Sequence, residues 1–377
     1  MRLSRRIAGV VEGGADGWEI YYAARAKMAA GHDVLNLTVG DHDVKTDAPV
    51  IEAMAESAHG GNLGYAPVMG SDALRDAIAA RVTERTGATA ARENVIVTPG
   101  GQSALFAAMM TALDPGEACL LVTPCYATFP LTVRAASGRA VEVPADPERG
   151  FAPDLAALDA AAEASGARAL LINSPNNPTG AVYSRSDLEG IAEIVRARDL
   201  WLISDELYES QVHEGAHLSA RSLPGMAERT LVAGSLSKSH AMTGWRIGWL
   251  AGPAEAVACA GDLSIATTYG VPGFIQDAAL FALERGETGE AEIAARYRRR
   301  RDVVLAALEG ARGVRATPAA GGMYVMLDIR ATGLSGVAFA EGLLEQAGVA
   351  VMPGESFGAA GAAHLRVALT APEDRLR

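Results

Sequence analysis

The chain has 377 residues, 49% of them hydrophobic but only 5% aromatic, so it can form two domains or one large globular domain. The formal net charge of −12 argues against a general nucleic-acid or anionic-membrane surface, because either would need an extended positive face. The cysteines, Cys119, Cys125 and Cys259, are odd in number and are not spaced as metal ligands, which argues against a disulfide framework or a metal site.

The N-terminal segment, up to about Met28, is expected to form an arm and a helix. Its first residues carry positive charge, but no apolar stretch long enough for a signal peptide follows, and no later segment is apolar for long enough to span a membrane. We therefore expect a cytoplasmic protein. Residues 33–40 then predict a short strand that ends in a glycine turn, and residues 49–57 predict a helix.

A second helix is predicted from Ser71, which has the character of an N-terminal cap, because Leu74, Ile78 and Val82 recur at helical spacing. From residue 94 to residue 251, continuous apolar strands alternate with helices. The expected strands are 94–98, 118–123, 139–143, 169–173, 201–204, 230–234 and 247–251, and the helices between them are 103–113, 128–136, 154–164 and 186–198. This order predicts an α/β fold with a mostly parallel, seven-stranded sheet covered by helices on both faces.

The C-terminal part predicts a smaller α+β domain. Helical patterning covers residues 278–283 and 290–308, strands are expected at 322–328 and 364–369, and a helix is expected at 337–346. The N-terminal arm is expected to join this part. The predicted division is therefore an arm and part of the small domain (residues 1–44), a large domain (45–277) and a C-terminal small domain (278–377).

Several loops at the carboxyl ends of the expected strands carry groups that can bind a ligand, and in parallel sheets ligands bind at that edge. The first loop, residues 98–103, is a glycine-rich turn before an apolar helix, so its free N–H groups and the helix dipole favour an anion. The alternative is a plain strand-to-helix connection. The second, residues 173–180, combines two prolines with Asn176 and Asn177, which can aim amide donors; a simple turn is the alternative.

A third loop, residues 204–208, ends an apolar strand with Asp205, Glu206 and Tyr208. A carboxylate there can hold a protonated ring nitrogen, and a phenol can bond a ring hydroxyl, although acidic residues at strand ends are also common helix caps. The stretch 235–249 places Lys238 among hydroxyl groups and glycines, shortly before Arg246. A lysine can form a Schiff base with a carbonyl, and an arginine can bind a phosphate, so together they suggest a carbonyl compound that carries a phosphate. The alternative is a pair of surface cations.

The combination of these motifs resembles the pyridoxal-phosphate enzymes of fold type I, and more closely the class I/II aminotransferases. The resemblance extends over nearly the whole chain, with the motifs in the family's order and spacing. It implies a Schiff base between Lys238 and pyridoxal 5'-phosphate, with Asp205 paired to the pyridine nitrogen so that the ring acts as an electron sink. Asn177 and Tyr208 match the residues that bond the phenolic oxygen of the ring.

The same resemblance implies further roles. The residues that match the phosphate-binding set are Gly101, Gln102, Ser103, Ser235, Ser237 and Arg246. Tyr126 matches the aromatic residue that stacks on the ring; otherwise it is a core aromatic. Tyr65 is similar to the tyrosine that reaches the phosphate of the neighbouring subunit, which implies a homodimer with shared active sites. Arg366 matches the arginine that binds the substrate α-carboxylate, and Gly40 matches the glycine whose backbone closes over that carboxylate. Without the resemblance, Arg366 would be interpreted as a cation of an edge strand and Gly40 as a turn residue.

The activity implied is a ping-pong transamination from an L-amino acid to a 2-oxo acid, by family habit 2-oxoglutarate. A fold-type-I lyase acting by C–S cleavage or β-elimination, or a decarboxylating relative, would share Lys238 and Asp205, whereas a non-catalytic binder would have lost the lysine. Side-chain specificity stays open, because Gln102, Tyr126 and residues 41–43 depart from the pattern of aspartate-using relatives. Three residues of the arm are candidates for lining an apolar pocket or for core packing: Trp18, Ile20 and Tyr21.

Overall fold

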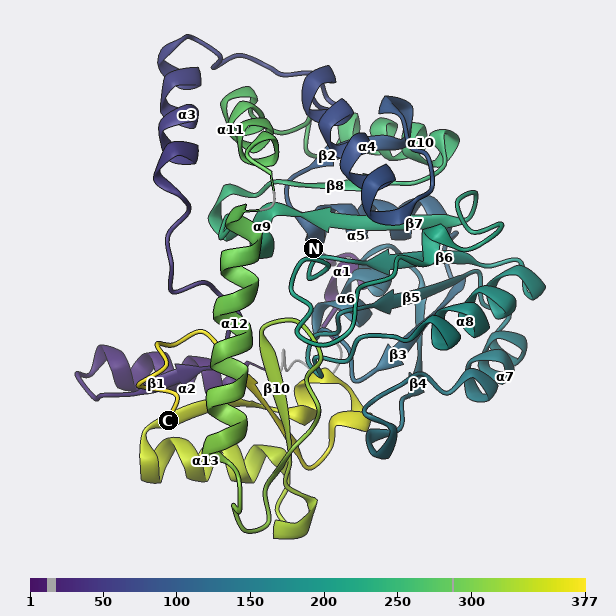
Figure 1. Cartoon of the computed structure of the whole chain (residues 1–377). Coiled ribbons are helices and arrows are strands. Elements are labelled where there is room, and N and C mark those ends of the chain that lie inside the picture. The colour runs from purple at the N-terminus through teal and green to yellow at the C-terminus, as the bar shows by residue number, and fades with distance from the viewer. Residues whose placement is uncertain (12–17, 287) are drawn as a thin grey trace.

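A computed structural model describes residues 1–11, 18–286 and 288–377, and the chain is built around two separate β-sheets (Figure 1). The long helix α12 (Thr288–Ala307) runs from the half that contains the larger sheet to the half that contains the smaller one (Figure 1). Within the described residues, no helix combines the length and the apolar character that crossing a membrane would require.

The larger sheet has seven strands in the order β2-β8-β7-β6-β5-β3-β4. All neighbouring strands are parallel except β8, which is antiparallel to both β2 and β7. The strands are β2 (Val95–Thr98), β3 (Ala118–Thr123), β4 (Arg139–Pro144), β5 (Ala169–Asn173), β6 (Trp201–Asp205), β7 (Thr230–Ser235) and β8 (Gly248–Ala251). The prediction of a mostly parallel, seven-stranded sheet is confirmed.

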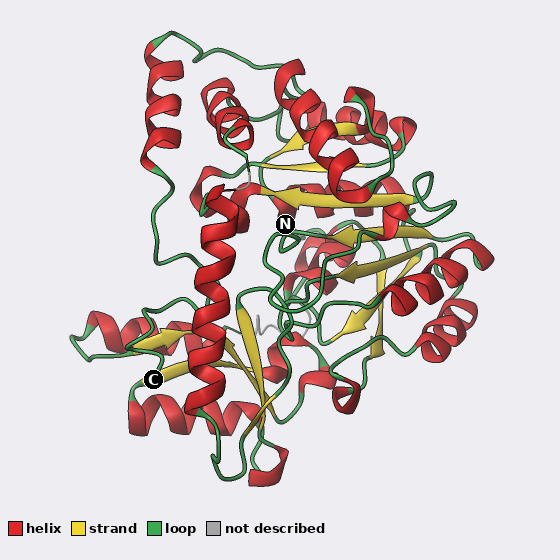
Figure 2. Ribbon diagram, viewed as in Figure 1, coloured by secondary structure: helices red, strands yellow, loops and turns green. Residues whose placement is uncertain are grey.

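Helices cover both faces of this sheet, as the red helices beside the yellow strands show (Figure 2). Because successive side chains of a strand point to opposite faces, Leu170 of β5 packs in one core and Leu171 in another. The core that contains Leu171 is completed by α5 (Gly101–Ala112), α6 (Thr128–Ala135) and α10 (Ala254–Ala266). The opposite face is covered by α4 (Asp72–Thr86), α7 (Leu155–Ser165), α8 (Arg185–Ala197) and α11 (Gly273–Glu284), which packs against α3 (Ala48–His59).

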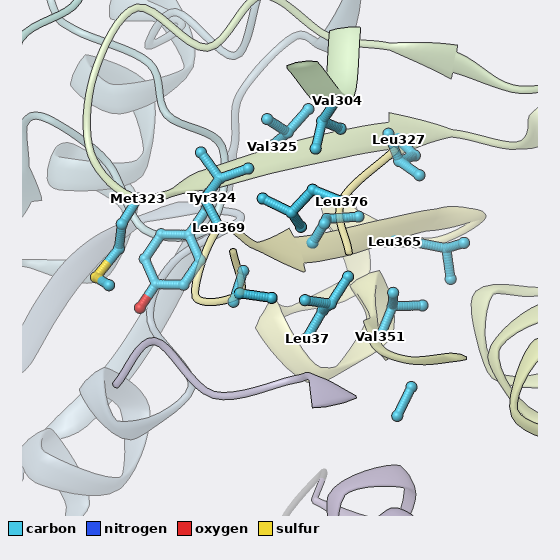
Figure 3. Packing of buried hydrophobic residues seen from close by; sticks show 14 of the residues in the cluster. Leu37, Val304, Met323, Tyr324, Val325, Leu327, Val351, Leu365, Leu369 and Leu376 are labelled. Carbon is cyan, nitrogen blue, oxygen red and sulfur yellow. The ribbon is translucent and has the colours of Figure 1, made fainter. Parts of the chain in front are cut away.

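The smaller sheet joins the two ends of the chain. Its order is β1-β11-β12-β10-β9, with β1 parallel to β11 and the other pairs antiparallel. The strands are β1 (Leu35–Leu37), β9 (Arg315–Ala316), β10 (Tyr324–Asp328), β11 (Val349–Pro353) and β12 (His364–Ala368). The helices α2 (Glu19–Ala29), α12 and α13 (Gly336–Ala347) contribute to its core, part of which is drawn in Figure 3.

Local signals explain several element boundaries. The Ser71 hydroxyl accepts a hydrogen bond from the backbone N–H of Leu74 at 3.4 Å, and Leu74, Ile78 and Val82 are buried, so the predicted cap and apolar stripe of α4 are confirmed. Two elements of the structure, α10 and β11, were not predicted from the sequence. Helix α10 is rich in small residues and lacks a clear apolar period, and β11 follows α13 directly across Gly348, with no loop to mark its start.

Candidate active site

A cavity of about 200 Å³ opens at the carboxyl edge of the larger sheet, and residues of the smaller sheet complete its wall. Its lining residues are Trp18, Val39, Gly40, Gly101, Gln102, Leu105, Tyr126, Asn173, Asn177, Asp205, Leu207, Tyr208, Ser237, Lys238, Thr243, Arg246, Tyr324 and Arg366. Most of the charged and amide groups predicted from separate loops therefore face one space.

The sheet topology explains this convergence. Asn173 ends β5 and Asp205 ends β6, and these parallel strands terminate at the same edge. Strand β8 runs the other way, so the residues before it lie at that edge too, and its first residue, Gly248, pairs with the last residues of both β2 and β7. Arg246 is thereby brought beside the carboxyl ends of the parallel strands.

Lys238 lies on the single-turn helix α9 (Leu236–Ser239), directly after β7. Its Nζ donates a hydrogen bond to the backbone carbonyl of Gly40 at 2.5 Å, and its own carbonyl accepts from Gln211 Nε2 at 2.8 Å. The half-buried amine therefore points into the cavity, toward the loop that follows β1.

Asp205 is a buried residue whose carboxyl group ends β6 and which lines the cavity, with 5% of the residue exposed. Burial raises its pKa from 3.8 to about 7; the backbone N–H of Leu207, 3.2 Å from Oδ1, acts against this, and the charge of Glu206 adds to it. The side-chain amide of Asn173 donates to the backbone carbonyl of Asp205 at 3.0 Å and so fixes the strand end. A carboxyl group in this setting is stabilised as an anion once a cation lies beside it.

Two phenols meet inside the cavity. The hydroxyl groups of Tyr208 and Tyr324 are 3.1 Å apart, and both residues are buried. Burial and the neighbouring phenol raise the pKa of Tyr208 well above its ordinary value, so the Tyr208 hydroxyl group stays protonated at neutral pH. Tyr208 follows Asp205 by three residues, which puts a neutral donor next to the buried acid.

Arg366 is fully buried, with 1% of the residue exposed. Its Nη1 donates to Asn177 Oδ1 at 2.9 Å and its Nη2 to the carbonyl of Thr38, while Nε is buried without a partner. The guanidinium lies between two aromatic rings, 4.4 Å from the centroid of Tyr324 and 4.5 Å from that of Phe357. Among the described residues no carboxylate forms an ion pair with Arg366, and burial lowers its pKa, so an anion entering the cavity would be stabilised there.

The glycine-rich loop packs against Arg246. Gly100 has a φ of +81° and caps the N-terminus of α5, and a Cβ on it would lie 2.4 Å from Arg246 Nη2. Arg246 Nη1 donates to the carbonyl of Thr243 at 2.7 Å. A helix N-terminus with free N–H groups and an exposed guanidinium beside it suits a phosphate dianion.

Three predicted residues lie outside the cavity lining. Ser103 lines a separate, mostly apolar cavity of about 510 Å³, and the buried Ser235 hydroxyl donates within its own loop, to Ile247 O at 2.8 Å or Ser237 Oγ at 2.8 Å. Tyr65 is 92% exposed and packs edge-on against Tyr269, with ring centroids 5.2 Å apart. Their roles stay predictions.

Two further predicted residues, Gln102 and Tyr126, line the cavity but also contact side chains of α6. The Gln102 side chain donates to Thr132 at 2.7 Å and accepts from Thr128 at 3.0 Å, so its contacts at the cavity edge are with α6. Tyr126 lines the cavity and packs edge-on against Phe129 at 5.8 Å, and burial raises its pKa. Tyr126 is therefore held by core packing while one side of it faces the cavity.

The two alternatives for the arm residues, lining a pocket and packing in the core, are both observed. Trp18 lines the cavity, whereas Ile20 is buried in the core of the smaller sheet. Sequence reasoning missed Tyr324. Strand periodicity alone does not reveal it, because Tyr324 shares a face with Arg366 only through the pairing of β10 with β12, in which Met326 lies opposite Arg366.

Comparison with known proteins gives a consistent result. The sequence profile of the family described as aminotransferase class I and II matches residues 32–377. The arginine–pyruvate transaminase AruH of Pseudomonas aeruginosa is 44% identical over 378 residues, which cover 100% of this chain and 94% of that protein. The aspartate/prephenate aminotransferase of Thermus thermophilus is 40% identical over 92% of this chain and 89% of its own length. The solved structure of the aspartate aminotransferase from Thermus thermophilus with maleate matches with a TM-score of 0.93 at 37% identity, covering 100% of this chain and 97% of that one.

Proposed function

This chain belongs to the class I and II aminotransferases, and from that premise we propose which of its residues transfer an amino group from an L-amino acid to a 2-oxo acid. Enzymes of this family depend on pyridoxal 5'-phosphate, and the chain is a transaminase of fold type I. The lyase and decarboxylase alternatives are not favoured, because the relatives that match over the full chain are named as transaminases.

Features of the cavity fit this cofactor. The buried Asp205 carboxyl, whose pKa burial raises to about 7, needs a cation, and a protonated pyridine nitrogen supplies one. The Gly100 turn, which has no room for a Cβ, and the adjacent Arg246 suit a phosphate. Lys238 is a primary amine on the same edge. When bound, pyridoxal 5'-phosphate supplies an aldehyde that accepts the amino group and a ring that delocalises the electrons left on the substrate α-carbon.

Within this cavity, Lys238 would hold the aldehyde carbon covalently, Asp205 the ring nitrogen, and Asn177 and Tyr208 the ring oxygen. Tyr126 would cover the face of the ring. The phosphate would be bound by Gly101, Gln102, Ser103, Ser235, Ser237 and Arg246, and by Tyr65 from a second copy of the chain. Support for this assignment is the common cavity that most of these residues line.

The substrate would be held through its α-carboxylate. Arg366 is a cation that lines the cavity, is buried, and has no anionic partner among the described residues. Its Nη1 donates a hydrogen bond to Asn177 Oδ1, and the Gly40 carbonyl accepts one from Lys238. Lys238 Nζ, once released from its covalent attachment, would be the base that moves the proton of the α-carbon. The same groups would act in reverse on the incoming 2-oxo acid.

The charged groups that line the cavity restrict which substrates the chain can bind. Among the described residues, the cations that line the cavity are Lys238, Arg246 and Arg366, all of which already have a proposed role, so a second carboxylate has no dedicated partner within this chain. Gln102 stands where some aspartate-using relatives have a lysine. The expected acceptor is 2-oxoglutarate, and pyruvate is the second candidate because the relative from Pseudomonas aeruginosa is named an arginine–pyruvate transaminase.

We also propose that the chain forms a homodimer with shared active sites and lies in the cytoplasm. We propose as well that it is divided into residues 1–44, 45–277 and 278–377. Tyr65 and Tyr269 are exposed aromatic side chains in contact with each other, which suits a subunit interface. All three cysteines are free thiols, as a reducing compartment favours. The pairing of β1 with β11 supports grouping the N-terminal arm with the C-terminal domain.

The experiment that tests the central assignment is Lys238→Ala, with the exposed Lys45→Ala as the matched control. The loaded wild-type and Lys45→Ala proteins should retain the cofactor covalently after borohydride reduction, as intact mass shows, and should turn over a panel of amino donors with 2-oxoglutarate or pyruvate. Lys238→Ala should do neither. Full turnover by Lys238→Ala would refute the assignment.

A further inference from the structure

We propose that Tyr324 is a positioning residue with two separable contacts: its ring holds Arg366 in place for a carboxylate, and its hydroxyl orients Tyr208. This inference rests on the proposed function, since it takes Arg366 as the carboxylate-binding group and Tyr208 as the donor to the cofactor ring oxygen. Tyr324 is 3% exposed and lies at the start of β10, where the smaller sheet meets the cavity.

The first contact addresses how a buried cation is held without an anion. Of the five N–H groups of Arg366, one is used on Asn177 and one on the Thr38 carbonyl, while Nε has no partner. The faces of the guanidinium are covered by the rings of Tyr324 and Phe357, at 4.4 Å and 4.5 Å from their centroids. Aromatic faces attract a cation, and the effect is larger when water is excluded. The two rings also prevent the planar group from tilting.

The second contact concerns the hydroxyl groups. Tyr324 Oη is 3.1 Å from Tyr208 Oη, and either atom can be the donor. If Tyr324 donates, the Tyr208 hydrogen is left for an acceptor in the cavity, and the bond makes that hydroxyl a stronger donor. In Figure 3 the Tyr324 ring lies at the margin of the aliphatic core, and its oxygen points away from the labelled leucine and valine side chains.

A third observation places Tyr324 against the loop after β1. A Cβ on Gly40 would lie 1.8 Å from the Tyr324 hydroxyl oxygen, and the Gly40 carbonyl accepts from Lys238. Tyr324 therefore contacts two proposed functional groups directly, the Arg366 guanidinium and the Tyr208 phenol, and also Gly40, the hydrogen-bond partner of the Lys238 amine. A residue that only filled the core would not need a hydroxyl at this position.

The test compares Tyr324→Phe, which keeps the ring, with Tyr324→Leu, which loses both contacts, and with Phe357→Leu, which loses only the opposite ring. Val325→Ala is the matched control, because Val325 is fully buried on the same strand and pairs with Val367, which puts it on the opposite face of the sheet from Arg366. Arg366→Gln tests the premise. All variants are studied as the loaded protein, with melting temperature recorded to confirm folding.

The first readout is the dissociation constant for pyruvate, measured by calorimetry without an amino donor. We expect Tyr324→Leu and Phe357→Leu to bind pyruvate about 3- to 30-fold more weakly, as loss of a cation–aromatic contact predicts, with KM of the amino donor rising in parallel. Tyr324→Phe and Val325→Ala should bind as the wild type does.

The second readout is the midpoint of the pH-dependent change in visible absorbance of the bound cofactor. The Tyr208 donor stabilises a negative ring oxygen, so weakening it should raise the midpoint, by about half a pH unit or more for one lost hydrogen bond. Tyr324→Phe and Tyr324→Leu should both show the rise, and Phe357→Leu should not.

The outcomes distinguish the inference from its premise. If Arg366→Gln binds pyruvate as tightly as the wild type, the assignment of Arg366 is wrong, and the first contact has no function to serve. If Arg366→Gln binds weakly but Tyr324→Leu binds normally, or no more weakly than Val325→Ala, the positioning role is overturned while the assignment stands. An unchanged midpoint in Tyr324→Phe would overturn the second contact.

Discussion

The backbone carbonyl of Gly40 accepts a hydrogen bond from Lys238 Nζ at 2.5 Å, which joins the loop after β1 of the smaller sheet to the lysine at the edge of the larger one. The same loop is fixed to α12 by Asp43, which forms two hydrogen bonds with Arg300 at 2.9 and 2.6 Å. Burial raises the pKa of Asp43, but the Arg300 hydrogen bonds and charge act against burial and hold it below its ordinary value. The amine thus meets a loop that is tied on its other side to a long helix.

A Gly40→Ala substitution should reduce activity strongly without unfolding the protein. The new Cβ would lie 1.8 Å from the Tyr324 hydroxyl oxygen and 2.6 Å from Cζ, so the loop or the ring must move. Because small misplacements at a reacting centre cost about 100-fold in rate, we expect kcat/KM to fall by about that factor. Gly289→Ala, whose Cβ meets nothing within 4 Å, is the control and should be unaffected.

Adding Tyr324→Phe to Gly40→Ala should recover part of the loss, because it removes the atom closest to the new Cβ. Steady-state kinetics of the wild type, the two single variants and the double variant complete a double-mutant cycle. Strictly additive losses would show that the substitution acts by another route than the contact with Tyr324.

Asp205→Asn should change the pH dependence of stability of the protein without cofactor. The pKa of Asp205 is raised by burial to about 7, above its value of 3.8 in the unfolded chain, so the folded state holds a proton that the unfolded state has lost. The contribution of Asp205 to stability is therefore most favourable below about pH 4 and falls as the pH rises to about 7, by up to about 4 kcal/mol. Asparagine cannot ionise, so thermal melts between pH 5 and 8 should show a shallower decline for the variant.

In the protein loaded with cofactor, the ionised Asp205 carboxylate should be stabilising instead of destabilising. With a cation bound beside it, the Asp205 carboxylate is stabilised, so the cofactor should raise the melting temperature of the wild type more than that of Asp205→Asn. An equal increase in both proteins at pH 8 would contradict the proposed contact with the ring nitrogen.

Gly100→Ala and Gly116→Ala form a matched pair. Both glycines have positive φ, +81° and +89°, and the ψ of 169° at Gly100 is in a region that essentially only glycine adopts, so alanine should cost each about 1–3 kcal/mol of stability. Only at Gly100 does the new Cβ meet a functional group, 2.4 Å from Arg246 Nη2. That guanidinium is the end of a flexible side chain and can move aside, so the additional effect should appear in cofactor binding: about 10- to 100-fold weaker affinity for Gly100→Ala, measured by titration.

Mixed dimers test the shared active site. Tyr65→Ala and Lys238→Ala are each expected to be poorly active alone. If Tyr65 serves the partner's site, a hybrid dimer contains one site with both residues intact, and equal mixing should restore about a quarter of wild-type activity after subunit exchange. Activity that stays at the average of the two separate proteins would rule out the contribution of Tyr65 in trans.

The sequence predicted the larger sheet well because its strands are continuous apolar runs with turn residues at their ends. Strand β3 was predicted with its observed bounds, 118–123, and every residue in it is buried. The smaller sheet was harder. Strand β11 directly follows Gly348, the left-handed cap of α13, and β1 pairs with it from more than 300 residues away in the chain. Such a long-range parallel pairing has no local signal.

The candidate site was predictable where one loop carried several chemical groups, and less so where a single side chain acts across elements. Asp205 and Tyr208 lie within four residues of each other, and Lys238 lies among hydroxyls and glycines. Tyr324, in contrast, is an ordinary strand tyrosine until the fold brings it to Arg366 and Tyr208. The arm residue Trp18 likewise reaches the cavity only through tertiary packing.

The antiparallel direction of β8 has a consequence for how ligands are exchanged. Lys238 and Arg246 lie on the one connection between the paired strands β7 and β8, whereas Arg366 is carried by the smaller sheet. A hinge movement of one sheet relative to the other would change the distance from the lysine to Arg366 and leave the span from the lysine to Arg246 as it is. In the proposed assignment, the enzyme could thus release a finished product at every turnover while Arg246 and Asp205, both on the larger sheet, keep the prosthetic group in place even when Lys238 is detached from it.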